Sequence, residues 1–232
     1  PLLNEESIRG AMWDPDAGLV TPRSQDVVNF AVETAKEKGA LSTFTDTPAI
    51  DFDVENGRIT GVKTDKGTIK TNKVVITSGI WGPLMGKKAG VPVPLMPVEH
   101  PLLFFGPLPE IQGTEELLVY PLLRDQGNSA YVRDTGRLHG GMLEWGYYED
   151  KEPRLVEPED IGNPEKTMIS DSMRYLDLEE VAEPLEKAFE TTPILNELGW
   201  DEKSSFNGLL SVTPDAGSLI GESPEVRGFW LC

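Results

Sequence analysis

The side chains with the clearest capacity for chemistry in this sequence are two histidines and a tyrosine followed closely by an arginine. His100 lies between two prolines in PVEHP, and His139 lies in RLHGG. Histidine is the side chain that exchanges protons near neutral pH, so each of the two is a candidate for proton transfer. Tyr131 and Arg133 are two positions apart on a predicted strand and therefore point to the same face. Taken singly, each is interpreted as structural: His100 as a satisfied or surface histidine, His139 as a strand or turn residue, and Tyr131 as a half-buried tyrosine beside a solvated arginine.

The composition describes a soluble globular chain and excludes several classes of function. The 232 residues carry 39 acidic and 21 basic side chains, a net charge of −18 that repels phosphate backbones and anionic membrane surfaces. Cys232 is the one cysteine, so no internal disulfide or cysteine-based metal site is available. We expect no metal, no nucleic-acid partner and no membrane insertion, and the sequence shows neither a signal peptide nor an 18-residue apolar run.

The first half of the chain predicts a helix followed by a meander. GLVTP supplies a loop, and apolar residues at helical spacing then predict a helix over 24–38. Two short turns at Asn56-Gly57 and Lys66-Gly67 separate alternating apolar runs, a pattern typical of a β-meander. The run KVVIT predicts a buried strand, and a short helix over 80–89 ends at Gly90.

The second half predicts a longer antiparallel sheet with a helix across it. The segment VPVPLMPVEHPLLFFGPLP holds six prolines in nineteen residues, which favours edge strands and a folded-back loop over a central strand. The remaining predicted elements are strands over 117–123, 129–134 and 137–145, a surface excursion over 146–163, a helix over 177–191 and a last strand GFWLC. Clusters of acidic residues at 149–150, 157–160 and 179–180 are interpreted as solvated faces. The fold class is α+β, a mixed β-sheet with flanking helices.

Known site motifs are absent, and two glycine-bearing segments remain. The G-x-G-x-x-G fingerprint, the P-loop, H-E-x-x-H and G-x-S-x-G do not occur. In TSGIWG, Ser78 and Gly79 follow the apolar run KVVIT, where small residues let backbone N–H groups approach a ligand. TPDAGSLIGE has the same character near the end of the chain. Alone, the first is a strand-to-helix turn and the second a hairpin.

In order and with their spacing, these segments resemble the FAD-dependent D-amino-acid-oxidase-like superfamily, and within it the dimethylglycine and sarcosine dehydrogenase and oxidase branch. The segments that carry the resemblance are MWDPDAGLVTPRS with its helix, VVITSGIWGPLMGKKAGVPVPLMPVEHPLLFF and FNGLLSVTPDAGSLIGESPEVRGFWL. The resemblance implies a middle portion of such a flavoprotein, without its Rossmann start, so we expect this fragment to be inactive by itself. It also implies three parts: 1–92 as a partial FAD-binding domain, 93–204 as an antiparallel substrate-binding domain, and 205–232 as a return to the FAD domain.

The resemblance implies oxidative demethylation of an N-methylated amino acid such as dimethylglycine or sarcosine, with FAD as the redox cofactor. Matched by motif, His100 and Tyr131 line the substrate pocket as catalytic residues. The segment with Ser78, Gly79 and Trp81 runs beside the flavin pyrophosphate and ribose. The loop with Pro214, Asp215 and Gly217 lies near the isoalloxazine. Arg133 or Arg124 is expected to pair the substrate carboxylate, because arginine binds that group in a bidentate manner.

Other readings stay open. The same superfamily includes enzymes that act on glycine, D-amino acids or glycerol 3-phosphate, although the acidic balance disfavours the phosphate ester. A different class is a non-enzymatic module that binds a small amine or a partner chain. The resemblance further implies a folate partner through a C-terminal region outside this sequence. It places the protein in the bacterial cytoplasm or, in a eukaryote, in the mitochondrial matrix.

Overall fold

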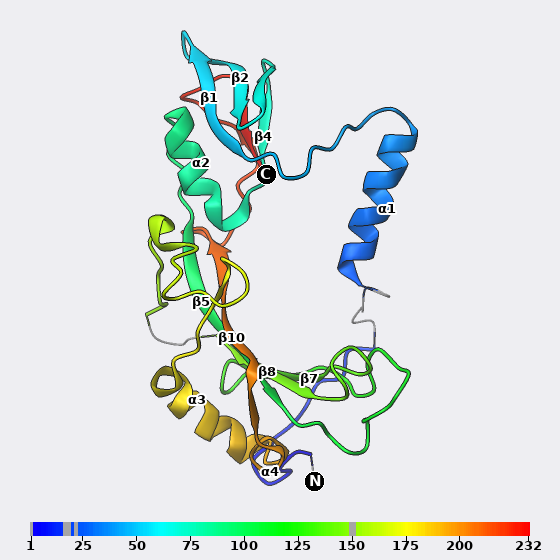
Figure 1. Ribbon diagram of the computed structural model, residues 1–232. Helices are drawn as coiled ribbons and strands as arrows, with labels where there is room; N and C mark the ends of the chain where they lie inside the picture. The colour runs from blue at the N-terminus through cyan, green and yellow to red at the C-terminus, as the bar shows by residue number, and fades with distance from the viewer. Residues whose placement is uncertain (1, 16–19, 21–22, 149–151) are drawn as a thin grey trace. The chain divides into compact units, whose positions relative to one another are not determined.

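The computed structural model describes residues 2–15, 20, 23–148 and 152–232 (Figure 1). Most of the predicted GLVTP loop and the Glu149-Asp150 acidic pair lie outside these residues. The helices are α1 (Ser24–Glu37), α2 (Gly82–Ala89), α3 (Leu178–Thr191) and α4 (Ile194–Leu198), with short 3-10 turns η1 (Gly79–Trp81) and η2 (Pro158–Asp160). None of the described helices is both long enough and apolar enough to cross a membrane.

Twelve strands are present in the described residues, and they form three sheets. The strands are β1 (Ala49–Glu55), β2 (Arg58–Thr64), β3 (Gly67–Lys70), β4 (Val74–Ile76), β5 (Met96–Phe105), β6 (Leu123–Asp125), β7 (Ala130–Asp134), β8 (Leu143–Tyr147), β9 (Met173–Arg174), β10 (Trp200–Val212), β11 (Gly221–Glu222) and β12 (Phe229–Leu231). The strand orders are β1-β2-β3, β6-β7-β8-β5-β10-β9 and β11-β12-β4. The mixed α+β class predicted from the sequence is confirmed.

The chain forms two compact units. The first combines 1–43, 100–151 and 175–207, and the second combines 44–99, 152–174 and 208–232. The strands β5 and β10 each run from one unit into the other. The assignment of 1–92, 93–204 and 205–232 to FAD and substrate domains stays a prediction.

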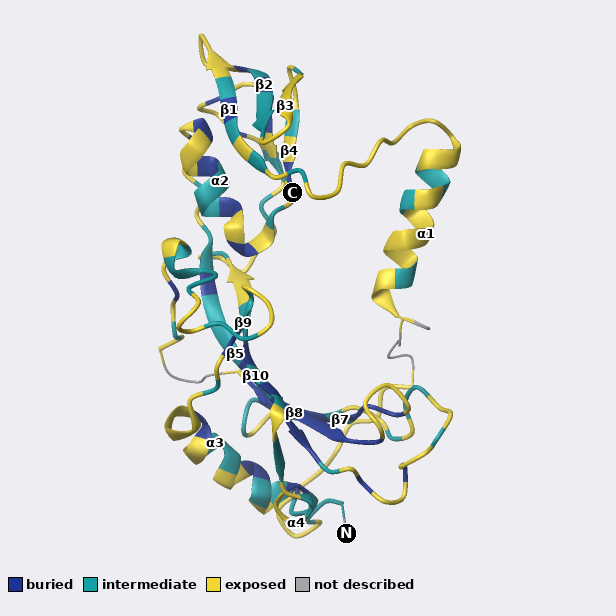
Figure 2. Cartoon of the chain, viewed as in Figure 1, coloured by how far each residue is buried: buried dark blue, intermediate teal, exposed yellow. Residues whose placement is uncertain are grey.

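The core of the first unit lies on one face of its strands. Figure 2 shows β7 and β8 as largely buried. Trp145 of β8 pairs with Leu103 of β5 and with Val132 of β7, and all three side chains are buried. The amphipathic helix α3 contributes Val181 and Ala188 to the same cluster. Asp177 caps this helix by accepting a hydrogen bond from the backbone N–H of Glu179.

The second unit has its own core beneath the meander. Phe52 and Ile59 of β1 and β2 pack with Phe229 of β12, and the rings of Phe52 and Phe229 meet edge to face at 5.4 Å. The helix α2 lies beside β1 (Figure 1) and ends at Gly90, whose φ of 76° is the left-handed conformation predicted for a helix stop. The strand β4 was predicted to be buried, but Val75 is 59% exposed.

The proline-rich segment is the largest departure from the sequence prediction. It forms β5, a ten-residue strand between β8 and β10, where edge strands and a folded-back loop were predicted. The ladder with β8 starts at Leu102, after both Pro97 and Pro101. Pro97 and Pro101 therefore lie before the part of β5 that pairs with β8, so neither proline interrupts that ladder.

Two other predicted strands begin later than expected. The segment 117–122 is irregular because the buried carboxylate of Asp134 accepts hydrogen bonds from the backbone N–H groups of Val119 and Tyr120, replacing ladder partners. The strand predicted over 137–145 starts at Leu143, and the residues before it form turns that include His139.

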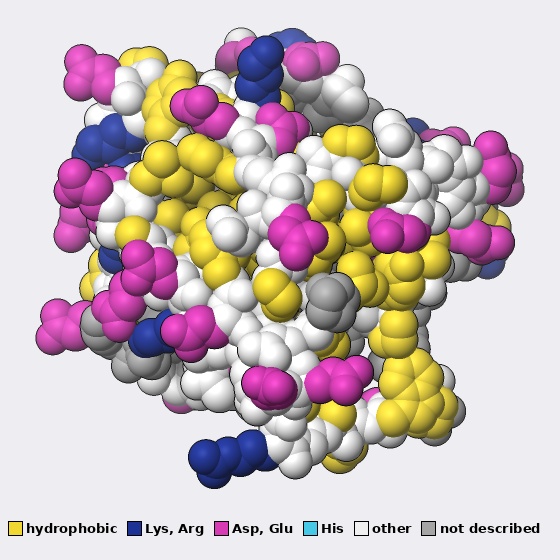
Figure 3. Space-filling model, turned by 90° about the horizontal axis from the view of Figure 1, so that it is seen from below, with side chains coloured by type: hydrophobic (Ala, Val, Ile, Leu, Met, Phe, Trp, Pro, Cys, Tyr) yellow, Lys and Arg dark blue, Asp and Glu magenta, His cyan; other side chains and the backbone are white. Residues whose placement is uncertain are grey.

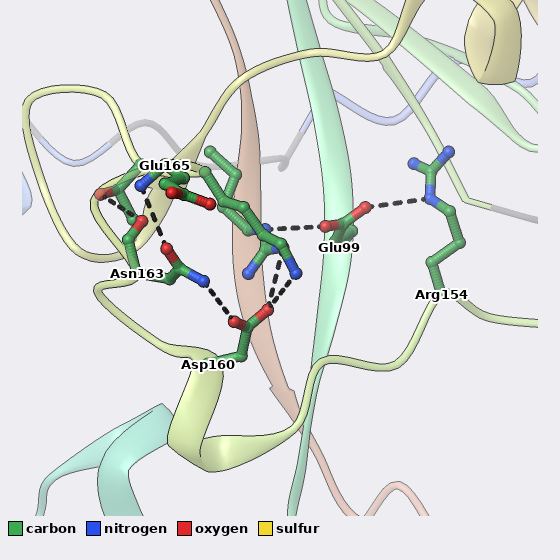
Figure 4. Close-up of polar contacts among 8 residues, drawn as sticks. Glu99, Arg154, Asp160, Asn163 and Glu165 are labelled. Carbon is green, nitrogen blue, oxygen red and sulfur yellow. Dashed lines mark hydrogen bonds and ion pairs between the residues drawn. The ribbon is translucent and has the colours of Figure 1, made fainter.

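A network of ion pairs ties the predicted surface excursion to β5 within the second unit (Figure 4). The Oε1 atom of Glu99 lies 2.9 Å from Nε of Arg174, and its Oε2 atom lies 3.3 Å from Nε of Arg154. Arg174 also reaches Asp160, at 3.5 Å, and Asp160 accepts from Lys166 at 2.7 Å. The Lys166 ammonium, then Asn163, lowers the pKa of Asp160 to about 2.

Within the acidic cluster at 157–160, Asp160 departs from the predicted solvated face, since its side chain is 28% exposed and pairs with Arg174, whereas Glu157 and Glu159 are exposed as predicted. The side chains of Glu99 and Arg174 are only 15% and 9% exposed, so their charges are largely shielded from water. On the face shown in Figure 3, acidic side chains are spread out rather than gathered in one cluster.

Glu99→Gln is expected to lower the free energy of unfolding by about 2–4 kcal/mol, because two shielded arginines lose their shared carboxylate. Denaturant unfolding measures the change. The matched control is Lys87→Gln, which breaks the exposed pair between Lys87 and Glu159 and should cost about 1 kcal/mol or less. Equal effects of the two substitutions would contradict the structural importance of Glu99.

Candidate functional site

The register of the largest sheet brings four of the chemically capable side chains to one face. Successive residues of a strand point to opposite faces, so the neighbours of the buried core residues face the other way. Tyr131 pairs with Arg124 across β6 and β7 and with Gly146 across β7 and β8. In the β5 ladder Leu102 also pairs with Gly146. His100, two residues before Leu102, therefore shares the face of Tyr131 and Arg124.

The rings of His100, Tyr131 and Tyr148 meet on this face. We call these three rings, with the adjoining Gly146 and Arg124, the aromatic site. The centroid of the His100 ring lies 4.7 Å from that of Tyr148 and 5.9 Å from that of Tyr131. The two tyrosine rings lie 6.1 Å apart. Tyr148 is 44% exposed, so the site is open to solvent on this side.

A hydrogen bond of 3.0 Å joins Nε2 of His100 to the hydroxyl of Tyr131. Partial burial lowers the pKa of His100 below its ordinary value of 6.5, because burial disfavours the imidazolium cation. Burial, then the charge of Glu144, raises the pKa of Tyr131 to about 12. At neutral pH the pair consists of a neutral imidazole and a protonated phenol, which together can take up one proton and donate one hydrogen bond.

The two candidate arginines are in different environments. Arg133 forms an ion pair with the buried carboxylate of Glu144, its partner in the β7 and β8 ladder. The guanidinium of Arg124 instead lies over the ring of Tyr148, 5.3 Å from its centroid. Among the described residues, no carboxylate forms an ion pair with Arg124. The charge of Arg133 is therefore paired with Glu144, whereas the charge of Arg124 beside Tyr131 is not paired with a carboxylate among the described residues.

The second unit contains a separate pocket of about 370 Å³. It lies where β4 ends, and residues 211–219 and the end of β12 complete it. Its lining residues are Ile76, Ser78, Gly79, Gly82, Val93, Leu95, Ser211, Val212, Thr213, Ala216, Gly217, Ser218, Leu219, Leu231 and Cys232. Such a volume lies within the range of pockets that bind small molecules.

The structure brings only some of the predicted cofactor residues to this pocket. Ser78, Gly79 and Gly217 line it, whereas Trp81, Pro214 and Asp215 do not. Asp215 organises the loop instead, because its Oδ1 accepts a hydrogen bond from the backbone N–H of Gly217. Trp81 is 38% exposed and lies in the turn that leads into α2.

The pocket has a polar group ready for a ligand. The Oγ atom of Ser78 is buried, and it has no hydrogen-bond partner among the described residues. A buried hydroxyl without a partner is costly unless a bound group satisfies it. Gly79, with a φ of 52°, lets the backbone turn directly after Ser78. Apolar side chains, among them Ile76, Val93 and Leu219, line the pocket beside this polar group.

Tyr148 and Gly146 belong to the aromatic site although sequence reasoning did not single them out. The alternation in WGYYED gave a possible signal for Tyr148, since it is two positions beyond Gly146 on the same face. For Gly146 the sequence gave none, because its contribution is the missing Cβ. The described residues also contain no group of three or more His, Cys, Asp or Glu able to hold a metal ion.

Comparison with characterised proteins gives several relatives, among them two mitochondrial dehydrogenases of methylated amino acids. The chain is 26% identical over 231 residues to mitochondrial dimethylglycine dehydrogenase of Rattus norvegicus, covering all of the chain and 26% of that protein. It is 31% identical over 245 residues to mitochondrial sarcosine dehydrogenase of Homo sapiens, covering all of the chain and 23% of that protein. The chain therefore spans about a quarter of the length of these curated relatives.

Among solved structures, L-proline dehydrogenase from P. horikoshii is similar, with a TM-score of 0.66 and 24% identity over 89% of this chain and 48% of that one. Iminodiacetate oxidase from Chelativorans sp. BNC1 gives a TM-score of 0.58 at 15% identity over 89% of this chain and 48% of that one. These likenesses show the fold. The profile of the DAO family, FAD dependent oxidoreductase, matches residues 1–232. Since the match spans the whole sequence, the chain belongs to the DAO family of FAD-dependent oxidoreductases.

Proposed function

We propose that the protein oxidises the N-methyl carbon of a small N-methylated amino acid, such as dimethylglycine or sarcosine, in an FAD-dependent reaction. The observation that carries the proposal is the pairing of His100 with Tyr131 on the same sheet face as the free charge of Arg124. The names of the relatives support this substrate class, since they include dimethylglycine, sarcosine and 4-methylaminobutanoate enzymes.

In the proposed reaction, FAD supplies an acceptor for the hydride equivalent that leaves the N-methyl carbon. The protein's task is to bind the amino acid and remove its ammonium proton, because only the neutral amine can lose a hydride and become an iminium ion. His100 accepts that proton at an imidazole nitrogen, and the Tyr131 hydroxyl orients the ring or the substrate through its hydrogen bond. Arg124 pairs with the substrate carboxylate.

Residues of the second unit are proposed to hold part of FAD. Ser78, with its buried hydroxyl, and Gly79 suit the polar portion of the cofactor, and Gly217 borders the same pocket. Trp81, Pro214 and Asp215 are proposed to shape the two loops rather than to touch the group. A folate partner and a mitochondrial or cytoplasmic location stay predictions.

A non-enzymatic role is the second candidate, because one relative is a regulatory subunit. The chain is 27% identical over 244 residues to the mitochondrial pyruvate dehydrogenase phosphatase regulatory subunit of Mus musculus. The two candidates differ in what FAD does. A binding module would show no reduction of its flavin by any of the amines.

His100→Ala in the full-length, FAD-loaded protein that contains this chain is expected to slow flavin reduction by dimethylglycine by about 100-fold, the usual scale for loss of an acid-base group. Anaerobic stopped-flow absorbance of the flavin measures the rate. The matched control is His139→Ala, which changes the other histidine, in an exposed turn, and should leave the rate unchanged. Equal rates for the His100→Ala variant and the unsubstituted protein would return His100 to a structural role. No reduction of the unsubstituted protein by dimethylglycine or sarcosine would sink the proposed function.

The pH dependence follows from the lowered pKa of His100. Above about pH 6.5 the imidazole is neutral and can accept the proton, so kcat/KM has its full contribution from this group. As the pH falls through the lowered pKa, the imidazolium forms and kcat/KM decreases. A pH profile of kcat/KM should therefore show an acidic limb below pH 6.5 that the His100→Ala variant lacks. An identical limb in that variant would assign it to another group.

Gly146→Ala is expected to displace Tyr131, because a Cβ at position 146 would overlap the tyrosine hydroxyl and ring. Loss of about an ångström of positioning slows flavin reduction by roughly 10-fold to 100-fold. In a Tyr131→Ala background the same substitution should add no further loss. Gly127→Ala serves as the control, since its Cβ would meet its nearest neighbour at 3.4 Å. Additive losses from Gly146→Ala and Tyr131→Ala would show that Gly146 acts by another route.

A further inference from the structure

The ring of Tyr148 contacts both the proposed acid-base pair and the available arginine. Its ring lies 4.7 Å from that of His100, and the guanidinium of Arg124 lies over it at 5.3 Å. Arg124 is at the same time the direct cross-strand partner of Tyr131. One aromatic face thus keeps a cation on the side of the sheet where His100 and Tyr131 form their hydrogen bond.

An exposed arginine has many rotamers, and its guanidinium spends little time in any one of them without a partner. For Arg133 the carboxylate of Glu144 is that partner, and it also neutralises the charge. The π face of Tyr148 orders the guanidinium of Arg124 without neutralising it, because a ring quadrupole carries no net charge. An arginine held in this way can still form a bidentate pair with an incoming carboxylate.

We propose that Tyr148 is a positioning residue that holds Arg124 for the substrate carboxylate, so that the aromatic site selects methylated amines that carry a carboxylate over those that do not. The inference rests on the proposed function, which it refines by naming the residue that sets this selectivity. The selectivity comes from the ring face of Tyr148. Its hydroxyl is not required.

Two unreactive probes test the inference by binding alone. Trimethylglycine and choline both carry a trimethylammonium group, and they differ in that the first has a carboxylate where the second has a hydroxymethyl group. Neither has a nitrogen lone pair, so the readout does not depend on turnover. Isothermal titration of the FAD-loaded protein gives the ratio of the two dissociation constants, which we call the carboxylate preference.

The unsubstituted protein should prefer trimethylglycine by about 10-fold or more, the scale of a charge-assisted pair. Tyr148→Leu should reduce the carboxylate preference by about 3-fold to 5-fold, the scale of an exposed cation–π contact, whereas Tyr148→Phe should retain it. Arg124→Gln should abolish the preference, and adding Tyr148→Leu to it should cause no further change. Tyr175→Leu is the matched control, since this tyrosine is 60% exposed and, within the described part of the chain, its ring does not contact Arg124 or His100.

Three results would overturn the inference: no preference in the unsubstituted protein, a preference that survives Tyr148→Leu, or equal weakening of both probes by that substitution. Equal weakening would mean that the ring contacts the ammonium group or supports the fold. Loss of the preference in Tyr148→Phe would assign the effect to the hydroxyl and also contradict the inference. Failure of the proposed function is distinct, because dimethylglycine would then fail to reduce the flavin while the carboxylate preference and its response to Tyr148→Leu persisted.

Discussion

The pairing of Tyr131 with Gly146 across β7 and β8 is the constraint on which the aromatic site depends. In this register Trp145 and its partners face the core, and the residues between them face the other way. A slip of one residue would exchange the two faces, exposing the core and burying the charge of Arg124. The hydrophobic core therefore selects the arrangement of the polar groups. Gly146 adds a condition of its own, since only a residue without a Cβ leaves room for the Tyr131 ring.

Where local signals decide structure, the sequence was sufficient. The helix predicted over 24–38 is α1, which helical periodicity indicates, and the helix ended by Gly90 is α2, because a left-handed glycine stops a helix locally. Long-range partners decided the rest. The prolines of β5 led us to predict edge strands from the sequence. In the structure, the pairing of β5 with β8 starts after Pro97 and Pro101. The irregular segment 117–122 depends on the carboxylate of Asp134, which lies more than ten residues away in sequence.

The same division applies to the site. His100 and Tyr131 could be named from motif order, and the structure joins them by a hydrogen bond. The difference between Arg124 and Arg133 depends on their neighbours. Glu144 forms an ion pair with Arg133, and the ring of Tyr148 contacts Arg124. Such a difference depends on pairing across strands, which no single segment of sequence contains. The roles of these residues in catalysis are proposals. Membership of the FAD-dependent oxidoreductase family is shown by the match over the whole sequence.

The parallel pairing of β12 with β4 has a consequence for how the pocket forms. Val74 pairs with Phe229 and Ile76 with Leu231, so the ladder closes a loop of roughly 150 residues. Contacts of such high sequence separation form slowly and late in folding. Ile76 and Leu231 both line the pocket, which therefore does not exist in a chain whose β12 has not yet docked. A ligand that binds there stabilises the docked state by mass action, and so links the completion of folding to the supply of that ligand.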